Sequence, residues 1–483
     1  TQPDRDPLAR IHALWGLGEM RPTTPQTPWI LTWPWDDPEP RVRAQAAKVA
    51  GDLGWNRFAA PLIEALTDDS APVAFQAGLA IGKIGSPEAG AALVQALSKN
   101  NNLDPFLRHA FIAGLHGCWP ATEIHTLSAH PSEAVRRAAV VALRRLRSPL
   151  VATFLNDRTL TVRRDAARAI HDDFSISQAL PSLALALDNP STWGDEALAR
   201  RALSANLRVG GDENAQRLKR LALNADVPTD LRSEALLCLA SWYTDPMIDR
   251  VVGRVRPLGP RDPKLGDRLL AELSPILLTS DSPKPLLTAL LNGANDRGLP
   301  VDVAYLDLLR DAENPTPLRT KALEILLQNE NPHQAQAIAI ALASNASELR
   351  RLAASDLAAR DFETLLELAQ DPESPTENPA TAPLLGILKR EPDPRADPWL
   401  ARLVADLEDD RLSSDKRLDV VLAAEASTDP GLQSRIQRYK AGFEDSGRLG
   451  WKRLAAEGGA AESGRQVYEE HVAAQCVRCH NAG

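Results

Sequence analysis

The sequence is poor in aromatic residues and has no long uncharged apolar run. Phe, Trp and Tyr make up only 5% of the 483 residues, whereas 44% are apolar and 37 are Pro. Few aromatics and many prolines disfavour a β-rich domain and favour many short helices. No stretch of about 18 uncharged apolar residues occurs, so no segment is a candidate transmembrane helix. At this length the chain must form several domains or one extended array.

Basic residues are also in deficit, because the net charge is -9 and the pI is about 5.6. Proteins that follow nucleic-acid phosphates usually carry a basic excess, so we do not expect nucleic acid as a partner. Local basic patches remain possible. The start, TQPDRDPLAR, shows no charged n-region and no apolar h-region. We expect both ends of the chain to be cuts within a longer protein.

Cysteine is scarce, with four in the chain. Cys118 and Cys238 lie about four repeats apart in the array described below. Helices pack about 8 to 10 Å apart, so this separation is roughly 40 Å, whereas bridged Cα atoms lie within about 7 Å. We therefore expect two free thiols, with Cys238 a small core residue.

One helical template recurs along the chain. It appears in RVRAQAAKVAGDLG from Arg41, AVRRAAVVALRRLR from Ala134 and DLRSEALLCLASW from Asp230. An apolar anchor is followed by apolar residues at +4, +7, +8 and +11, which form one face of an α-helix. Where the signal is clear, anchors recur about every 27 to 37 residues, a period that predicts a solenoid. The anchors are Val42, Val73, Leu107, Val135, Val162, Ala199, Leu231, Leu318 and Leu349.

Each repeat is predicted to be a helix hairpin. Asp-Pro or a similar turn precedes many anchors, as in DDPEPRVR, and a second apolar run such as GAALVQALSKN follows. Pro suits a first helical turn, and Asp caps it. The pattern resembles HEAT repeats, including the lyase-type HEAT-like variety, over most of residues 4 to 425. The resemblance implies an all-α solenoid at 1–425 with about ten to twelve hairpins, irregular around 245–310, where RLLAELSPILL and KPLLTALLNGA still indicate helices.

Arginine often follows the anchor. Such residues could form an anion-binding ladder, but we favour a structural role, in which each bonds a neighbouring Asp or carbonyl. They are Arg43, Arg108, Arg136, Arg163, Arg232, Arg319 and Arg350. A denser group could serve a partner or DNA; it comprises Arg136, Arg137, Arg144, Arg145, Arg147, Arg163, Arg164 and Arg168. We expect the histidines His109, His116 and His171 to be packing or surface residues.

A tryptophan-rich segment, TPWILTWPWDDPEP, contains Trp29, Trp33 and Trp35. It is too short to be a repeat of its own. It is either a loop folded over the exposed end of the first repeats, which we favour, or an anchor for an upstream domain, since large rigid aromatics suit interfaces.

The composition changes near the carboxyl end. Residues 426–460 carry one helical run and then Gly and small residues, which predicts a linker. The chain ends in AESGRQVYEEHVAAQCVRCHNAG. Cys476 and Cys479 can add to the two vinyl groups of one haem, and His480 then lies beneath the iron as its axial ligand. A zinc site would need two further ligands and has no second Cys pair, and a redox dithiol would need a βαβ context.

This ending resembles the start of the cytochrome c domain in the PVC-type haem-binding CxxCH proteins, a family of membrane-bound dehydrogenase type. In that family a β-propeller, similar to sugar dehydrogenases that use pyrroloquinoline quinone (PQQ), precedes HEAT-like repeats and the cytochrome c domain. The order of repeats, linker and Gly-Arg-x-x-Tyr matches, and LARIHALWGLGEM resembles the first repeat after the propeller. The resemblance implies that Cys476 and Cys479 anchor haem c, that His480 binds its iron, and that Gly464 and Tyr468 are the contact pair of the first cytochrome helix.

The chain departs from that family at both ends. No propeller precedes residue 1, and no distal ligand or closing helix follows the motif, so we expect residues 461–483 to be the N-terminal fragment of a cytochrome c domain. Such a fragment should hold no properly ligated low-spin haem by itself. Met20 and Met247 lie in the solenoid and cannot supply the distal ligand. His471 is an alternative sixth ligand, although a solvated helix residue is the reading we favour.

The resemblance implies electron transfer through haem c from an upstream propeller, with PQQ only in that domain and the solenoid as scaffold. The partner would be that propeller or a redox protein. Covalent haem attachment takes place outside the cytoplasmic membrane, so we expect a periplasmic or cell-surface location. The alternative is a protein-interaction scaffold without redox function. No Gly-x-Ser-x-Gly, His-Glu-x-x-His or phosphate-binding Gly-rich loop occurs, so any dehydrogenase chemistry would belong to the parent protein.

Overall fold

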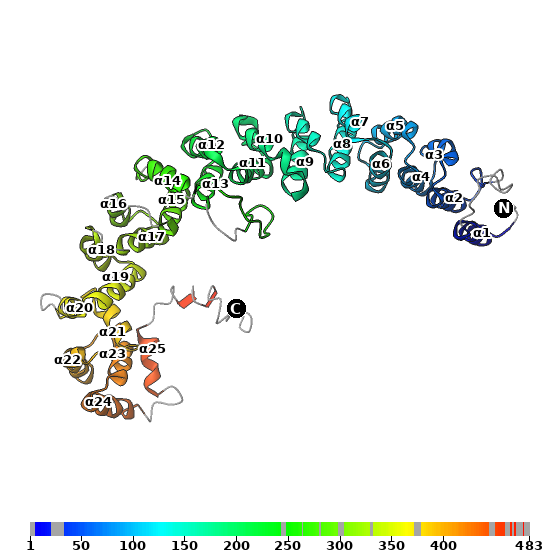
Figure 1. Ribbon diagram of the computed structural model, residues 1–483. Helices are drawn as coiled ribbons and strands as arrows, with labels where there is room; N and C mark the ends of the chain where they lie inside the picture. The colour runs from blue at the N-terminus through cyan, green and yellow to red at the C-terminus, as the bar shows by residue number, and fades with distance from the viewer. Residues whose placement is uncertain are drawn as a thin grey trace. The chain divides into compact units, whose positions relative to one another are not determined.

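The computed structural model describes residues 5–20, 33–242, 248–262, 264–279, 282–297, 304–328, 332–370, 378–443, 450–458, 464–465, 468–469 and 477. Within them every regular element is a helix, apart from one antiparallel bridge between Ile248 and Val255. The chain divides into two compact units, Thr1–Leu273 and Ser274–Gly483. The all-α helical-repeat fold predicted from the sequence is confirmed (Figure 1).

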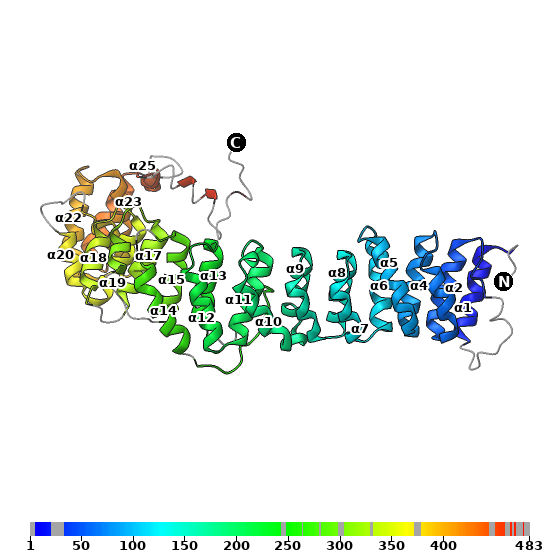
Figure 2. The same cartoon turned by 90° about the horizontal axis from the view of Figure 1, so that it is seen from above.

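The first unit consists of two rows of helices. The anchor-bearing helices lie side by side in the first row (Figures 1 and 2). They are α2 (Pro40–Leu53), α4 (Ala71–Ile84), α6 (Pro105–Cys118), α8 (Glu133–Arg145), α9 (Leu160–His171), α11 (Glu196–Val209) and α13 (Thr229–Ala240), and α1 (Pro7–Glu19) precedes them next to α2.

The second row returns the chain from each anchor helix to the next. It is built of α3 (Ala59–Ala65), α5 (Gly90–Asn100), α7 (Ala121–Thr126), α10 (Leu180–Leu185) and α12 (Gly211–Leu223). Short 3₁₀ segments supplement or replace these helices, at η2 (Asn56–Phe58), η3 (Pro87–Ala89), η4 (Leu127–Ala129), η5 (Pro149–Asn156), η6 (Phe174–Ala179), η7 (Ala186–Asp188) and η8 (Pro190–Thr192).

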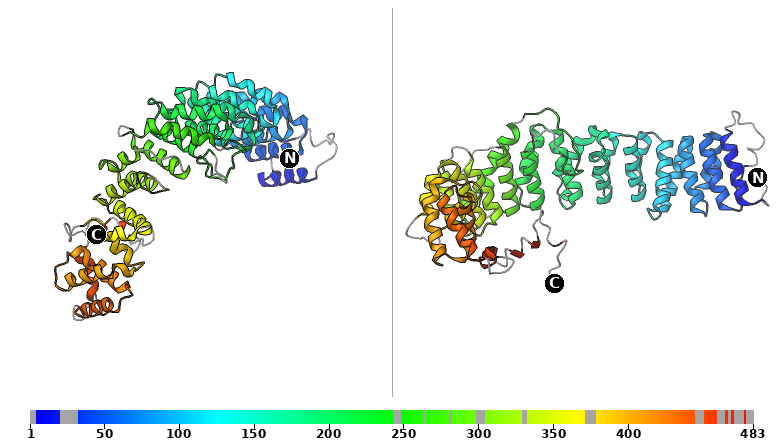
Figure 3. Two further views of the ribbon diagram at one scale, coloured as in Figure 1. Left: turned by 60° about the vertical axis from the view of Figure 1, so that its left-hand side comes forward. Right: turned by 90° about the horizontal axis from the view of Figure 1, so that it is seen from below.

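The second unit repeats the hairpin plan (Figure 3). The boundary between the units falls within α14 (Lys264–Leu277). The following helices are α15 (Lys284–Arg297), α16 (Ala304–Arg310), α17 (Thr316–Leu327), α18 (Gln334–Leu342), α19 (Ser347–Arg360), α20 (Phe362–Ala369), α21 (Thr381–Leu388), η9 (Pro394–Ala396), α22 (Asp397–Glu408), α23 (Ser414–Ala426), α24 (Pro430–Ala441), η10 (Gly450–Arg453) and α25 (Leu454–Glu457).

The helical run inside the predicted linker 426–460 is α24. Asp429 caps it, with Oδ1 accepting a hydrogen bond from the backbone N–H of Leu432 at 2.8 Å. Leu432 and Ile436 are buried, and the helix contacts α22 and α23. The packed hairpins of the second unit therefore extend to Ala441.

The irregular stretch predicted at 245–310 contains α14 and α15, as expected, and also an inserted loop. Residues 248–262 of this loop belong to the first unit and contact α9 and α11. Arg256 donates a hydrogen bond to the backbone O of His171 at 2.9 Å and lies 4.1 Å from the centre of the Phe174 ring. Arg261 donates to the carbonyl of Leu207, so the loop is tied to α9 and α11.

Glycines set the spacing of the first-row helices at the amino-terminal end. A Cβ on Gly82 of α4 would lie 2.6 Å from the carbonyl O of Ala113 in α6, and one on Gly51 of α2 would lie 2.6 Å from the Cα of Ala80 in α4. Side chains at these positions would collide with backbone atoms, so α2, α4 and α6 can approach this closely only with glycine there.

The tryptophan-rich segment packs on the first hairpin. The Trp33 side chain is buried, its ring centre lies 5.2 Å from that of Phe58, and its indole N–H donates to the backbone O of Ala46 at 3.3 Å. Trp35 lies 5.8 Å from the same ring. The prediction of a loop folded over the first repeats is confirmed for these two residues, whereas Trp29 lies outside the described residues.

Candidate functional site

The predicted haem-attachment residues Cys476, Cys479 and His480 lie outside the described residues, as does His471. Gly464 is described, and no described atom lies within 4 Å of the position that a Cβ there would take. The haem site therefore stays a prediction from the sequence.

The arginines that follow the anchors are mostly structural, as we favoured. Arg136 is 1% exposed and donates two hydrogen bonds to the carboxylate of Asp157, at 2.7 and 3.1 Å. It also donates to Thr159 and to the carbonyls of His130 and Pro131, so every guanidinium nitrogen has a partner. Such a fully bonded arginine clamps the loop after one repeat to the helix of that repeat.

In other repeats, the arginine after the anchor also bonds a nearby carboxylate or backbone carbonyl. Arg43 donates to both carboxylate oxygens of Asp68, at 2.8 and 2.9 Å. Arg232 and Arg319 donate to the carbonyls of Ala222 and Leu309, each at 2.9 Å. Residues such as these are not available to an external anion, and the ladder hypothesis is wrong for them. Arg108 differs, because its guanidinium makes no hydrogen bond or ion pair within the described part of the chain.

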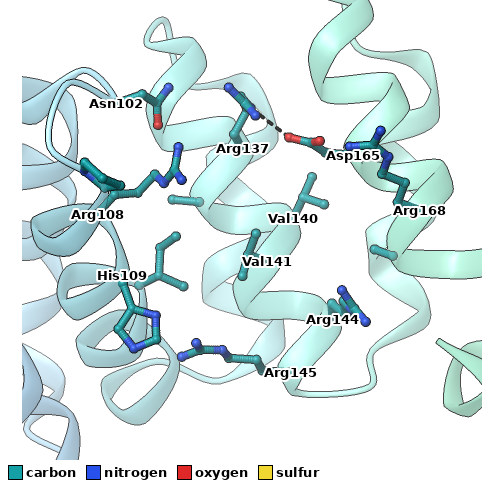
Figure 4. Close-up of a pocket in the computed structure, with 14 residues that line it drawn as sticks. Asn102, Arg108, His109, Arg137, Val140, Val141, Arg144, Arg145, Asp165 and Arg168 are labelled. Carbon is teal, nitrogen blue, oxygen red and sulfur yellow. Dashed lines mark hydrogen bonds and ion pairs between the residues drawn. The ribbon is translucent and has the colours of Figure 1, made fainter. Parts of the chain in front are cut away.

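Arg108 lies in a groove of about 430 Å³ between α6, α8 and α9 (Figure 4). On each helix the lining residues recur at the spacing of one helical face. The groove has an apolar floor of Ile112, Val140, Val141, Ala138 and Ala169, and a rim of arginines. The rim residues are Arg108 with His109 on α6, Arg137, Arg144 and Arg145 on α8, and Arg168 with Asp165 on α9.

Two rim arginines are paired with aspartates. Arg137 donates to Asp165 at 2.7 Å, and Arg144 donates to Asp173 at 3.3 Å. The pKa of Asp173 is lowered chiefly by the hydrogen bond from Ser175, with a smaller contribution from Arg144. The ion pair of Arg144 with Asp173 is therefore weaker than that of Arg137 with Asp165, in agreement with its longer distance.

The guanidinium groups of the other rim arginines, Arg108, Arg145 and Arg168, make no hydrogen bond or ion pair within the described residues. Each comes from a different helix. The charge of Arg145 affects a neighbouring side chain. The pKa of His116 on α6 is lowered, first by burial and second by the charge of Arg145. A concave surface with unpaired guanidinium groups over an apolar floor can bind carboxylates or phosphates.

The structure divides the dense arginine group predicted from the sequence. Arg137, Arg144, Arg145 and Arg168 meet in the groove, and Arg108 joins them. Arg136 is a buried clamp, Arg163 donates to Ser191 at 2.7 Å, and Arg164 pairs with Asp195. Sequence reasoning did not separate the two sets, because pairing depends on which Asp lies opposite in the next repeat.

Comparisons with known proteins support the repeat assignment. The family described as HEAT repeats matches residues 1–77 and 35–116. The match supports HEAT repeats over residues 1–116. No curated protein sequence matches it significantly.

Solved structures with similarity to the chain include Kap121p, with 13% identity, a TM-score of 0.38, and coverage of 93% of this chain and 48% of that one. An engineered protein has 15% identity and a TM-score of 0.25, with 83% and 95% covered. The S. pombe condensin Cnd3-Cnd2 subcomplex has 14% identity and a TM-score of 0.24, with 88% and 66% covered. The chain thus spans about half the length of Kap121p.

A second polar cluster lies between the helical repeats and the inserted loop. His171 has no exposed surface; its Nδ1 lies 2.9 Å from Asp172, and its Nε2 lies 2.8 Å from Ser204 Oγ and 3.4 Å from Asp249. Burial opposes ionisation of Asp249, but the hydrogen bond from His171 and the charges of His171 and Arg208 outweigh it and hold the pKa of Asp249 well below its usual range.

This Ser-His-Asp arrangement is a buried anchor for the loop. His171 is fully enclosed and Ser204 is only 8% exposed, so a substrate carbonyl could not reach the hydroxyl. The prediction that His171 is a packing residue is confirmed, and its polar partners are an addition that the sequence pattern did not indicate. The long sequence separation of Asp249 from His171 explains why.

The cysteines of the repeats are free and buried, as predicted. Burial raises the pKa of the Cys118 thiol to about 11 and raises that of Cys238 further. Among the described residues, no group of three or more His, Cys, Asp or Glu could hold a metal ion. No helix in the same ranges is long and apolar enough to cross a membrane.

Proposed function

We propose that the chain is a HEAT-repeat scaffold that binds a protein partner. The observation that supports this function best is the groove between α6, α8 and α9, which presents three unpaired arginines above an apolar floor. Solenoids present extended surfaces of this kind rather than enclosed active sites. The partner would be another domain of the parent protein, such as the propeller that the sequence resemblance implies, or a redox protein.

Nucleic acid is a less suitable partner. The chain carries a net charge of -9, and no Phe, Tyr or Trp lines the groove for base stacking. Some cations on other first-row helices are already paired, as in Lys83 with Asp52 at 2.6 Å and Arg201 with Asp172 at 2.8 Å. A track of phosphates along the row would meet these aspartates as well as the cations.

The scaffold function can be tested by direct binding. The polypeptide encoded upstream of residue 1 and the chain itself would be purified separately and mixed in a calorimeter, with an unrelated solenoid of similar net charge as control. We expect a saturable complex with the chain only. Failure of both the upstream polypeptide and the c-type cytochromes of the same organism to bind would contradict the proposal.

A second candidate function is electron transfer, and the Cys-x-x-Cys-His motif favours it. Cys476 and Cys479 would hold haem c through thioether bonds, with His480 as axial ligand, and the group would supply one-electron transfer. A PQQ-dependent dehydrogenase reaction would belong to the upstream domain. Because attachment takes place outside the cytoplasmic membrane, this function includes a periplasmic or cell-surface location.

Haem attachment can be tested independently of partner binding. The chain would be exported in a host with a c-type maturation system, and the denatured protein stained for covalent haem. We expect staining that is lost in the double variant Cys476→Ser, Cys479→Ser and kept in the matched control Cys118→Ala, Cys238→Ala. An unstained wild-type chain would refute the electron-transfer function and leave the scaffold function standing.

A further inference from the structure

The geometry of the groove points to the chemistry of the partner: we propose that it binds an extended acidic peptide segment containing aliphatic side chains. The inference rests on the proposed scaffold function and concerns only the groove between α6, α8 and α9. The unpaired arginines are Arg108, Arg145 and Arg168, one from each helix.

Charge complementarity argues for carboxylates. Of the five rim arginines, Arg137 and Arg144 form ion pairs with Asp165 and Asp173, and the side chains of the other three form no ion pair within the described residues. Guanidinium forks bind carboxylates through two parallel hydrogen bonds. An acidic ligand therefore adds the missing counter-charges, while a basic ligand would add repulsion.

The floor argues for aliphatic side chains between the carboxylates. Ile112, Val140, Val141 and Ala169 line the groove, and no Phe, Tyr or Trp side chain lines it. A purely ionic ligand, such as free phosphate, would leave this apolar surface in water. A peptide with leucine between acidic residues covers it and gains hydrophobic free energy.

The width of the groove fixes the length of the segment. Three neighbouring helices, packed about 8 to 10 Å apart, extend over roughly 20 Å. An extended chain rises about 3.3 Å per residue, so about six residues cross the groove. Within that length a peptide can place a carboxylate near each of the three helices.

A double-stranded nucleic acid fits less well. Its phosphates form a long regular track, whereas the unpaired arginines are confined to one groove. Asp165 also lies on the rim, at 2.7 Å from Arg137, and interrupts the positive surface. A peptide can place an uncharged residue opposite the Asp165 carboxylate, whereas a nucleic-acid backbone carries a negative charge at every nucleotide.

The test uses the full chain and a fluorescein-labelled peptide, Glu-Glu-Leu-Glu-Glu-Leu-Glu-Glu, measured by fluorescence anisotropy. We expect saturable binding that weakens as salt rises, because exposed charge pairs are screened. The same peptide with Gln for every Glu should bind at least about tenfold more weakly, since it lacks the charge-assisted hydrogen bonds.

The decisive variant is the triple change Arg108→Gln, Arg145→Gln, Arg168→Gln. It should reduce affinity for the acidic peptide by about tenfold or more. The matched control, Lys48→Gln, Lys99→Gln, Arg220→Gln, alters the net charge equally at exposed positions outside the groove. It should leave affinity within about twofold, because distant surface charges are screened. Equal thermal unfolding of both variants shows that folding is unchanged.

Three outcomes would overturn the inference. They are equal affinities of the two triple variants, equal affinities of the Glu and Gln peptides, and displacement of the peptide by duplex DNA at lower concentration than by unlabelled peptide. None of these removes the scaffold function, which is judged by binding of the upstream polypeptide. Loss of that binding in wild-type chain, with peptide binding intact, would instead contradict the scaffold function alone.

Discussion

Replacing Arg136 by Met should destabilise the first unit by about 3 to 5 kcal/mol, because it leaves a buried carboxylate without its partner. The side chains of Arg136 and Asp157 are 1% and 4% exposed, so water cannot take over the lost contacts. Met replaces the apolar stem of the arginine side chain but not its guanidinium group, so the change removes charge and hydrogen bonds more than apolar packing.

The structure supplies a matched control in the same helix. Arg144 is paired with Asp173, but the two side chains are 47% and 27% exposed and the atoms lie 3.3 Å apart. Exposed pairs contribute about 0 to 1 kcal/mol. Arg144→Met should therefore cost under about 1 kcal/mol, although the residue type and the partner type are the same.

Amide hydrogen exchange is the suitable assay, because repeat arrays can open locally. In Arg136→Met the amides of α8 and α9 should exchange faster, and those of α23 should be unchanged, since α23 lies in the other unit. The double variant Arg136→Met, Asp157→Leu should recover part of the loss. Equal effects of Arg136→Met and Arg144→Met would refute the reasoning that burial and complete hydrogen bonding decide the energy.

Two further perturbations test helix packing and charge pairing. Gly82→Ala should lower the free energy of unfolding by about 1 to 3 kcal/mol through overpacking, because its Cβ would lie 2.6 Å from the carbonyl O of Ala113. Gly16→Ala should leave the free energy of unfolding unchanged or raise it, because no atom lies within 4 Å of its Cβ position. Urea midpoints of the two variants measure the difference, and a larger loss in Gly16→Ala would contradict it. Acid should destabilise the first unit, because the hydrogen bond from Arg43 lowers the pKa of Asp68 in the folded state. The stabilisation is complete above the pKa of about 4 that Asp has in the unfolded chain. It is lost as the pH falls through the lower pKa of the folded state. Urea midpoints of the wild-type chain should stay level from about pH 7 to pH 5 and then fall. The fall should be less steep in Arg43→Met. A midpoint that rises on acidification would refute the stabilising pair of Arg43 and Asp68.

Local pattern was enough to predict the hairpins. The anchor positions Val42, Ala46, Val49 and Ala50 are all buried, as the helical spacing requires. The Asp-Pro starts are also local: Asp104 Oδ1 accepts from the N–H of Phe106 at 2.7 Å, next to Pro105 in the first turn. Such features depend on a few adjacent residues, so a sequence can indicate them directly.

The groove could not be predicted in the same way. Arg137 and Arg145 lie on one helix and are alike in sequence, but only Arg137 has an aspartate within reach, at Asp165. Their difference depends on the register between repeats 28 residues apart. The contact of Arg256 with His171 spans 85 residues. Helix periodicity contains no information about either, because both are set by tertiary packing.

Close glycine packing between first-row helices ends next to the groove. Gly82 in α4 brings that helix to backbone contact with α6, and Gly114 of α6 would place a Cβ 2.8 Å from the carbonyl O of Gly78 in α4. The next first-row helix, α8, has the sequence EAVRRAAVVALRR and contains no glycine. Its Val140 and Val141 face the groove, so α6 and α8 meet through side chains. α6 therefore lies at backbone contact with α4, whereas side chains separate α6 from α8 at the groove.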